Sequence, residues 1–148
     1  MLDHSKILVP VNGSSLDATV VALAAQLARR AKGRVYAIYV IEVRRTLPLD
    51  ADMPAERRDA DVALDRVERA AEEADQEIET EILQARDIGT AIVEEAVEAN
   101  VDLILMGIPY RRKFGEFDLG RTVPYVLKNA PCEVWVCREE IAGRNPGK

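Results

Sequence analysis

Strongly apolar runs alternate with helix-like segments along this 148-residue chain, and this alternation restricts the fold more than any other feature. The runs KILVPV (6–11), RVYAIYVIEV (34–43) and VDLILMG (101–107) have few polar interruptions, as is typical of strands buried on both faces of a parallel sheet. Between them lie segments with apolar residues at helical spacing. Strands and helices that alternate in this way form βαβ units with right-handed crossovers. We therefore expect a single-domain α/β fold, a three-layer sandwich with helices on both faces of a parallel sheet.

Two further strands complete the expected sheet. EIETEILQA (77–85) alternates apolar residues with glutamates, so it predicts a half-exposed strand near a sheet edge. CEVWV (132–136) is the fifth and last strand. We expect the domain to span residues 1–140 and residues 141–148 to form a flexible tail.

Residues that begin or end helices mark the segments between the strands. Ser14 or Ser15 is expected to cap the first helix, and Gly33 to supply its left-handed stop. Pro54 fits the first turn of a long second helix. Asp87 is expected to cap the third helix, so the chain is divided into clear units.

The composition excludes several classes of protein. A net charge of −6 and a pI near 4.9 argue against a general nucleic-acid surface, which requires a basic face. No apolar run reaches the length of a membrane span, and the first residues lack the layout of a signal peptide. We expect a cytoplasmic protein without membrane insertion.

The cysteines and the histidine do not suggest a metal site. Cys132 and Cys137 are five residues apart on one strand, so they face opposite sides at a separation of about 16 Å, beyond disulfide reach. They are expected to act as small apolar residues. The single histidine, His4, is near the N-terminus, and no metal is predicted.

Two loops follow the carboxyl ends of strands, which is where ligands bind in sheets of this kind. The first is VNGSS (11–15), and the second is GIPYRRKFGEFDLGRT (107–122). Residues 110–122 contain four basic and two acidic side chains, a local net charge of +2 in an acidic protein. Because this excess precedes a helix N-terminus, it favours an anion, and arginine can hold a phosphate through two hydrogen bonds.

Over nearly its whole length the chain resembles the universal stress protein family. The resemblance is carried by KILVPVNGSSLDA at the front, VDLILMG before the long loop and LGRTVPYVLKNAPCEVWV at the end. It implies a five-stranded parallel sheet of order 3-2-1-4-5. It also implies a homodimer formed through the last strand, with Val134, Trp135 and Val136 at the interface; for Trp135 ordinary packing under a helix is the alternative.

Many members of that family bind ATP through the pattern G-2x-G-9x-G-(S/T), from which this chain departs. Gly107 and Gly120 keep the spacing of the first and third glycines, but Tyr110 and Arg121 replace the second glycine and the Ser/Thr. Asn12 stands where an aspartate is usual. A bulky side chain at 110 and the missing N–H of Pro109 compromise a cradle of backbone amides. We interpret the loop as rebuilt with arginines for a phosphate, not necessarily that of ATP.

The resemblance and the loop together predict an adenine nucleotide (AMP, a cyclic dinucleotide or ATP) as ligand. Backbone groups around Val40 and Met106 would hold the base, Asn12 the ribose, and the arginines the phosphates. The full predicted site comprises Pro10, Val11, Asn12, Val40, Met106, Gly107, Arg111, Arg112, Gly120, Arg121 and Thr122. Alternatives remain open: the basic residues as a solvated turn, Asn12 as the acceptor of an Asx-type turn, and Tyr110 as either a base-stacking ring or a cover for the core.

No pairing of a nucleophile with a base is visible, so we do not expect an enzyme, and a weak ATPase is the least favoured reading. The leading hypothesis is a nucleotide-binding regulator. The alternative is a nucleotide-free dimeric interaction protein of the same fold. Because the loop also resembles stress-protein-like domains attached to amino-acid permeases, a transporter is a possible partner in either case.

Overall fold

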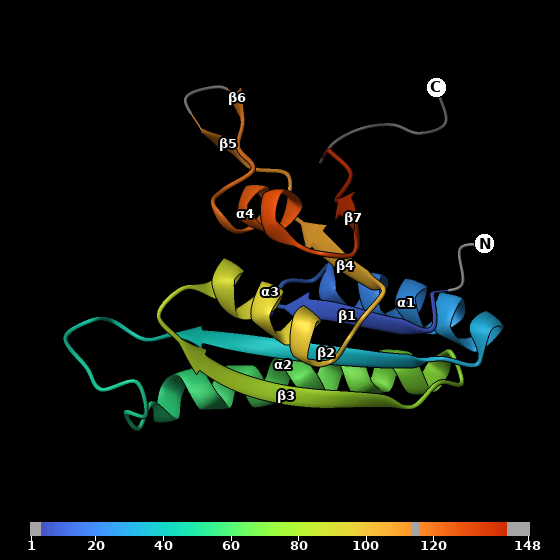
Figure 1. Ribbon diagram of the computed structural model, residues 1–148, viewed down its shortest axis with the longest axis horizontal. Coiled ribbons are helices and arrows are strands. Elements are labelled where there is room, and N and C mark those ends of the chain that lie inside the picture. Colours follow the sequence, from blue (N-terminus) through green and yellow to red (C-terminus); the bar gives the residue numbers. More distant parts are fainter. Residues whose placement is uncertain (1–3, 114–115, 142–148) are drawn as a thin grey trace.

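The computed structural model describes residues 4–113 and 116–141, and in these ranges five parallel strands form the main sheet. The strands are β1 (Lys6–Val11), β2 (Arg34–Glu42), β3 (Ile78–Ala85), β4 (Leu103–Ile108) and β7 (Glu133–Arg138). Their order is β3-β2-β1-β4-β7, with β3 and β7 at the edges (Figure 1). This confirms the order 3-2-1-4-5 and the edge position of 77–85. The expected tail, apart from Ile141, lies outside the described residues.

Helices cover both faces of the sheet. α1 (Asp17–Ala31) and α2 (Pro54–Glu73) lie on one face, and α3 (Ile88–Glu98) and α4 (Thr122–Asn129) on the other. β1 divides its side chains between the two layers: Ile7 and Val9 pack with α1 and α2, whereas Leu8 packs with α3 and α4. All three are fully buried, which explains why the strand is a continuous apolar run.

The cysteines follow the same division. Cys132, just before β7, packs against the α3–α4 core, and Cys137 packs against the α1–α2 core. The expected opposite orientation is therefore confirmed. Burial raises the pKa of both thiols, so they are protonated at neutral pH, as suits small apolar residues.

Two of the expected helix ends are confirmed, and two are wrong. α2 begins at Pro54, and Asp87 caps α3 by accepting a 2.9 Å hydrogen bond from the Thr90 N–H. Neither Ser14 nor Ser15 caps α1, because the chain makes a further turn and the cap position falls on Leu16. The left-handed residue after α1 is Lys32 (φ 54°), not Gly33.

Gly33 is needed for a different reason. A Cβ atom at this position would lie 2.1 Å from the backbone oxygen of Ser5. That oxygen accepts a 2.7 Å hydrogen bond from the N–H of Arg34, at the start of the β1–β2 pairing. Gly33 therefore allows the chain to leave α1 and pass directly against the beginning of β1.

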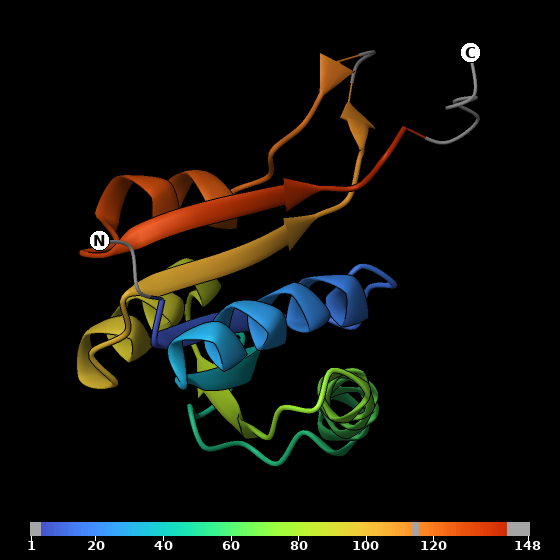
Figure 2. The same cartoon turned by 90° about the vertical axis from the view of Figure 1, so that its right-hand side faces the viewer.

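The long loop contains a small hairpin that the sequence did not predict. β5 (Arg112–Lys113) and β6 (Glu116–Phe117) pair antiparallel, and the N–H of Asp118 donates to the Arg111 oxygen at 2.9 Å. The hairpin projects beyond β4 and α4, away from the sheet (Figures 1 and 2). The two ends of the loop are thus drawn together, which places Arg111 and Asp118 next to each other at its base.

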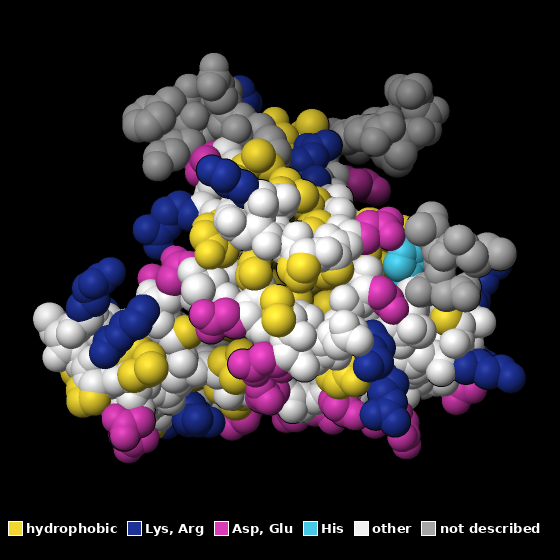
Figure 3. All heavy atoms as spheres, viewed as in Figure 1, with side chains coloured by type: hydrophobic (Ala, Val, Ile, Leu, Met, Phe, Trp, Pro, Cys, Tyr) yellow, Lys and Arg dark blue, Asp and Glu magenta, His cyan; other side chains and the backbone are white. Residues whose placement is uncertain are grey.

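The surface shows no single basic face in the view of Figure 3. Apolar side chains gather over α3 and α4, and acidic and basic side chains are interspersed around them (Figure 3). Val97, Tyr125 and Leu127 are among the exposed apolar residues of these helices. Within the described ranges, no helix is long and apolar enough to cross a membrane.

Candidate functional site

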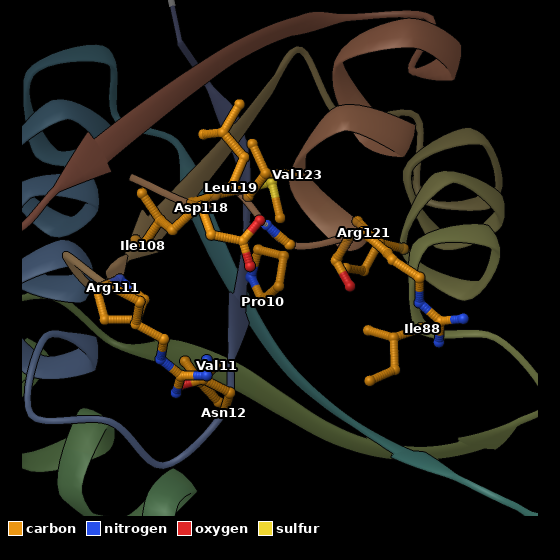
Figure 4. Close-up of a pocket in the computed structure, with 16 residues that line it drawn as sticks. Pro10, Val11, Asn12, Ile88, Ile108, Arg111, Asp118, Leu119, Arg121 and Val123 are labelled. Atoms are coloured by element: carbon orange, nitrogen blue, oxygen red, sulfur yellow. Dashed lines mark hydrogen bonds between the residues drawn. The ribbon is translucent and has the colours of Figure 1, made fainter. Parts of the chain in front are cut away.

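A cavity of about 250 Å³ opens at the carboxyl ends of β1 and β4. The strand order reverses between these two neighbours, so this is the switch point at which ligands bind in open α/β sheets. Its walls come from β1, β4, the start of α3, the long loop and the start of α4 (Figure 4). The fold therefore brings both predicted ligand loops to one hollow.

Nine of the eleven predicted site residues line this cavity: Pro10, Val11, Asn12, Met106, Gly107, Arg111, Gly120, Arg121 and Thr122. The other two do not. Val40 belongs to the buried core beside α3, and Arg112 is on the projecting hairpin.

Seven further residues line the cavity and were not predicted from the sequence: Ile88, Ile92, Ile108, Pro109, Asp118, Leu119 and Val123. Most of them form an apolar wall. The inward stripe of the third helix was the available signal for Ile88 and Ile92. Asp118 contributes to the loop's net charge, but nothing in the local sequence marks its carboxylate as facing a cavity.

Asn12 makes an Asx-type turn at the end of β1. Its Oδ1 accepts a 3.0 Å hydrogen bond from the Ser14 N–H, so the turn interpretation is correct, and the residue also lines the cavity. The backbone N–H groups of Asn12 and Gly13 donate to the carboxylate of Asp17, at 2.8 Å for Gly13. Burial raises the pKa of Asp17, and these hydrogen bonds partly offset that effect. The amides of Asn12 and Gly13 are therefore directed at Asp17.

Glycine is required at positions 107 and 120 for different structural reasons. A Cβ at Gly107 would lie 2.9 Å from side-chain carbons of both Leu16 and Val20, so this glycine lets α1 pack closely on β4. Gly120 has a φ of 70° with open space around it, so its backbone conformation requires it. Neither requirement depends on a ligand.

Of the three arginines predicted to hold phosphate, one is directed along the cavity. The side chain of Arg111 extends toward Val11 and Asn12 (Figure 4). Arg121 extends the opposite way, past Ile88, and its Nη2 lies 3.7 Å from a carboxylate oxygen of Glu42. The arginine cluster expected from the sequence is thus divided between the cavity and the outer surface.

Asp118 brings a negative charge into the same hollow. Its carboxylate points inward on the side of Pro10 (Figure 4), and its Oδ1 accepts a 3.3 Å hydrogen bond from the Gly120 N–H. The amide of Gly120, a glycine that lines the cavity, is therefore paired with a carboxylate from its own loop.

Tyr110 lies outside the cavity. The Cζ atom of Arg138 is 4.9 Å from the centre of the tyrosine ring, and the Tyr110 N–H donates to Glu139 at 2.9 Å. This residue therefore attaches the loop to the end of β7, and it is not placed to stack on a base in the cavity.

The single histidine is remote from this site. His4 precedes β1, at the opposite end of the sheet, where its Nε2 lies 3.0 Å from Glu133. Across the described part of the chain, no group of three or more His, Cys, Asp or Glu residues is arranged to hold a metal ion. The cavity itself offers amide, guanidinium and carboxylate groups together with apolar surface.

The strand order, the helices on both faces and the cavity at the switch point define a doubly wound α/β domain with a ligand-sized hollow. Residues 4–138 match the Universal stress protein family, and the chain belongs to that family. It is similar to Universal stress protein MJ0531 from Methanocaldococcus jannaschii, with 32% identity over 142 residues that cover 92% of this chain and 83% of the relative.

Solved structures share the fold. Universal stress protein UspA from Lactobacillus plantarum is 24% identical with a TM-score of 0.74, covering 93% of this chain and 100% of the other. The universal stress protein from Archaeoglobus fulgidus in complex with dAMP is 20% identical with a TM-score of 0.72, covering 91% and 98%. At these identities the similarity establishes the architecture.

Proposed function

We propose that this protein binds an adenine nucleotide in the cavity between β1 and β4. The observation that carries the proposal is the convergence of Asn12, Arg111 and Gly120 on one hollow at the switch point of the sheet. The solved structure from Archaeoglobus fulgidus with dAMP adds support, because that protein has the same fold.

Each part of a nucleotide has a suitable partner in the cavity. The base would pack against apolar side chains from α3 and β4, chiefly Ile88, Ile92 and Met106. Met106 keeps the role expected from the sequence, whereas Ile88 and Ile92 take the place of Val40. The side-chain amide nitrogen of Asn12 would donate to a ribose oxygen while Oδ1 holds the turn. Arg111 would hold a phosphate through its guanidinium group.

The size of the cavity favours a small ligand. Its volume of about 250 Å³ lies just below the range of roughly 300–1,000 Å³ for pockets that enclose drug-sized ligands. A mononucleotide with its phosphate near the opening suits this volume. A cyclic dinucleotide would leave one of its nucleosides outside.

We propose a binding and regulatory role for the site, without catalytic turnover. Asp118, the carboxylate that lines the cavity, is engaged with Gly120, and His4 is at the far end of the sheet. A regulator also needs a partner, for which a transporter is one candidate. Capture experiments with and without bound nucleotide would test whether the ligand changes the partner's affinity.

Assembly through β7, which does not require a nucleotide, is a second candidate function. β7 is an edge strand of the main sheet, and Val134, Trp135 and Val136 are each half-buried along it. An edge strand can pair with a second copy, which would cover these side chains. This assembly is compatible with nucleotide binding, because β7 does not line the cavity.

Thermal unfolding with AMP, ATP and cyclic di-AMP tests the proposed ligand, with GMP as the matched control for the base. We expect AMP to raise the unfolding temperature, since a ligand at 100 times its Kd stabilises the folded state by about 2.7 kcal/mol. Mass spectrometry of the denatured protein would identify any nucleotide that co-purifies. If no adenine nucleotide stabilises the protein and none co-purifies, the proposed function is wrong.

A further inference from the structure

The long loop fixes a carboxylate at the place where a phosphate would approach the glycine amide. Asp118 lies two residues before Gly120 and accepts its N–H at 3.3 Å, while its own N–H donates to the Arg111 oxygen at 2.9 Å. Both hydrogen bonds hold Asp118 at the base of the hairpin. Asp118 is therefore held once through its backbone N–H and once through its carboxylate, and its side chain lines the cavity.

In the loop after β1, backbone N–H groups also donate to a carboxylate of the chain. The carboxylate of Asp17, which is 7% exposed, accepts the N–H groups of Asn12 and Gly13. Thus, in both loops at the switch point, backbone amides already donate to carboxylates of the chain. A ligand with several phosphates finds these amides occupied, and it meets the negative charge of Asp118 in the cavity.

The basic side chains near the cavity offset the negative charge of Asp118 only in part. Arg121, although it lines the cavity, directs its guanidinium to Glu42 at 3.7 Å. Its positive charge also helps to hold the pKa of Asp87 below the usual range, after the larger effect of the hydrogen bonds from Thr90. This leaves Arg111 as the cation directed along the cavity, against the carboxylate of Asp118. A single guanidinium directed along the cavity suits a ligand that carries a single phosphate group.

We propose that Asp118 is the specificity-determining residue of this site: it selects adenosine monophosphate-class ligands and rejects nucleoside triphosphates. The inference rests on the proposed function and adds to it the phosphate number of the ligand. Arg111 holds the single phosphate. Further phosphoryl groups would be placed against the Asp118 carboxylate, and a like-charge contact of this kind discriminates strongly between ligands.

Calorimetric titration of the wild-type protein with adenosine, AMP, ADP and ATP tests this directly. We expect affinity to rise from adenosine to AMP and then to fall, with ATP at least about tenfold weaker than AMP. ATP binding as tight as AMP binding would overturn the role of Asp118 and leave the proposed function intact. If neither AMP nor ATP binds, the proposed function and this inference both fail.

The variant Asp118→Asn isolates the charge, because it keeps the shape and the acceptor for the Gly120 N–H. We expect ATP affinity to rise by about tenfold while AMP affinity changes by less than about threefold. Glu98→Gln, at the last residue of α3 and away from the cavity, makes the same change in net charge and should leave the AMP-to-ATP ratio unchanged. An unchanged ratio in Asp118→Asn, or an equal change in both variants, would contradict the proposal. The wild-type series is decisive even if the variant does not fold.

Discussion

Arg121 at the start of α4 reaches Glu42 at the end of β2, with 3.7 Å between guanidinium nitrogen and carboxylate oxygen. The arginine side chain is 86% exposed, so this ion pair contributes little to stability. Its consequence is the direction in which the arginine side chain extends. The guanidinium of Arg121 is directed out of the cavity, whereas that of Arg111 is directed along it.

The two arginines are therefore expected to differ in nucleotide binding. Arg111→Gln should weaken AMP binding by at least about tenfold, because it removes charge-assisted hydrogen bonds to the phosphate. Arg121→Gln makes the same chemical change and should alter the affinity by less than about threefold. Titration calorimetry measures both. Equal losses in the two variants would show that Arg121 turns inward when ligand binds.

Substitutions of Gly33 and Gly107 should lower the stability of the fold by different amounts. We expect Gly33→Ala to lower the free energy of unfolding by about 3 kcal/mol, because the new Cβ meets the backbone of Ser5, which cannot move without disturbing β1. Gly107→Ala should lower it by about 1 kcal/mol, because Leu16 and Val20 are side chains that can shift. Urea unfolding followed by circular dichroism gives both values. A larger loss for Gly107→Ala than for Gly33→Ala would contradict this order.

The sequence predicted the sheet because each strand carries its own signal, either an apolar run between helical segments or, in β3, an alternation of apolar residues with glutamates. The order of the strands came from the family resemblance, since pairing between distant segments leaves no local pattern. The hairpin was missed because strands of two residues, Arg112–Lys113 and Glu116–Phe117, are too short to show a period. The direction of Arg121 depends on Glu42, which is 79 positions away in the chain, and the loop sequence alone holds no sign of it.

The helix cap formed by Asp87 should stabilise the fold at neutral pH and lose this effect in acid. The side-chain and backbone donors of Thr90, at 2.7 and 2.9 Å, hold the pKa of this carboxyl below its usual value of 3.8. Because the folded-state pKa is lowered, the contribution is present above the unfolded value and is lost as the pH falls through the lowered pKa. Asp87→Ala should lower the free energy of unfolding at neutral pH by about 1 kcal/mol. The difference should shrink in acid, and Asp87→Asn, which can still cap α3, should stay near the wild type at neutral pH.

Asp17 should show the opposite pH dependence. Burial raises its pKa above 3.8, so its contribution to stability is full below the unfolded value and is lost as the pH rises through the raised folded pKa. The unfolding free energy of Asp17→Asn, relative to the wild type, should therefore increase as the pH is raised through this window. Denaturant titrations at several pH values measure the difference. A relative decrease in that window would show that the hydrogen bonds from Asn12 and Gly13 outweigh burial.

If two copies pair along β7, the substitution of one apolar residue of this strand by a charged residue should yield a monomer. Val136 is half-buried in the single chain, where it packs against the α3–α4 core, and a carboxylate there would also lie beside the strand-to-strand contact with a second copy. We expect the wild type to sediment as a dimer and Val136→Glu as a monomer. Val97→Glu places the same charge at a valine of α3 that is 60% exposed, and it should remain a dimer. Circular dichroism confirms that each variant is folded. A folded dimer of Val136→Glu, or a wild-type monomer at micromolar concentration, would exclude assembly through this edge.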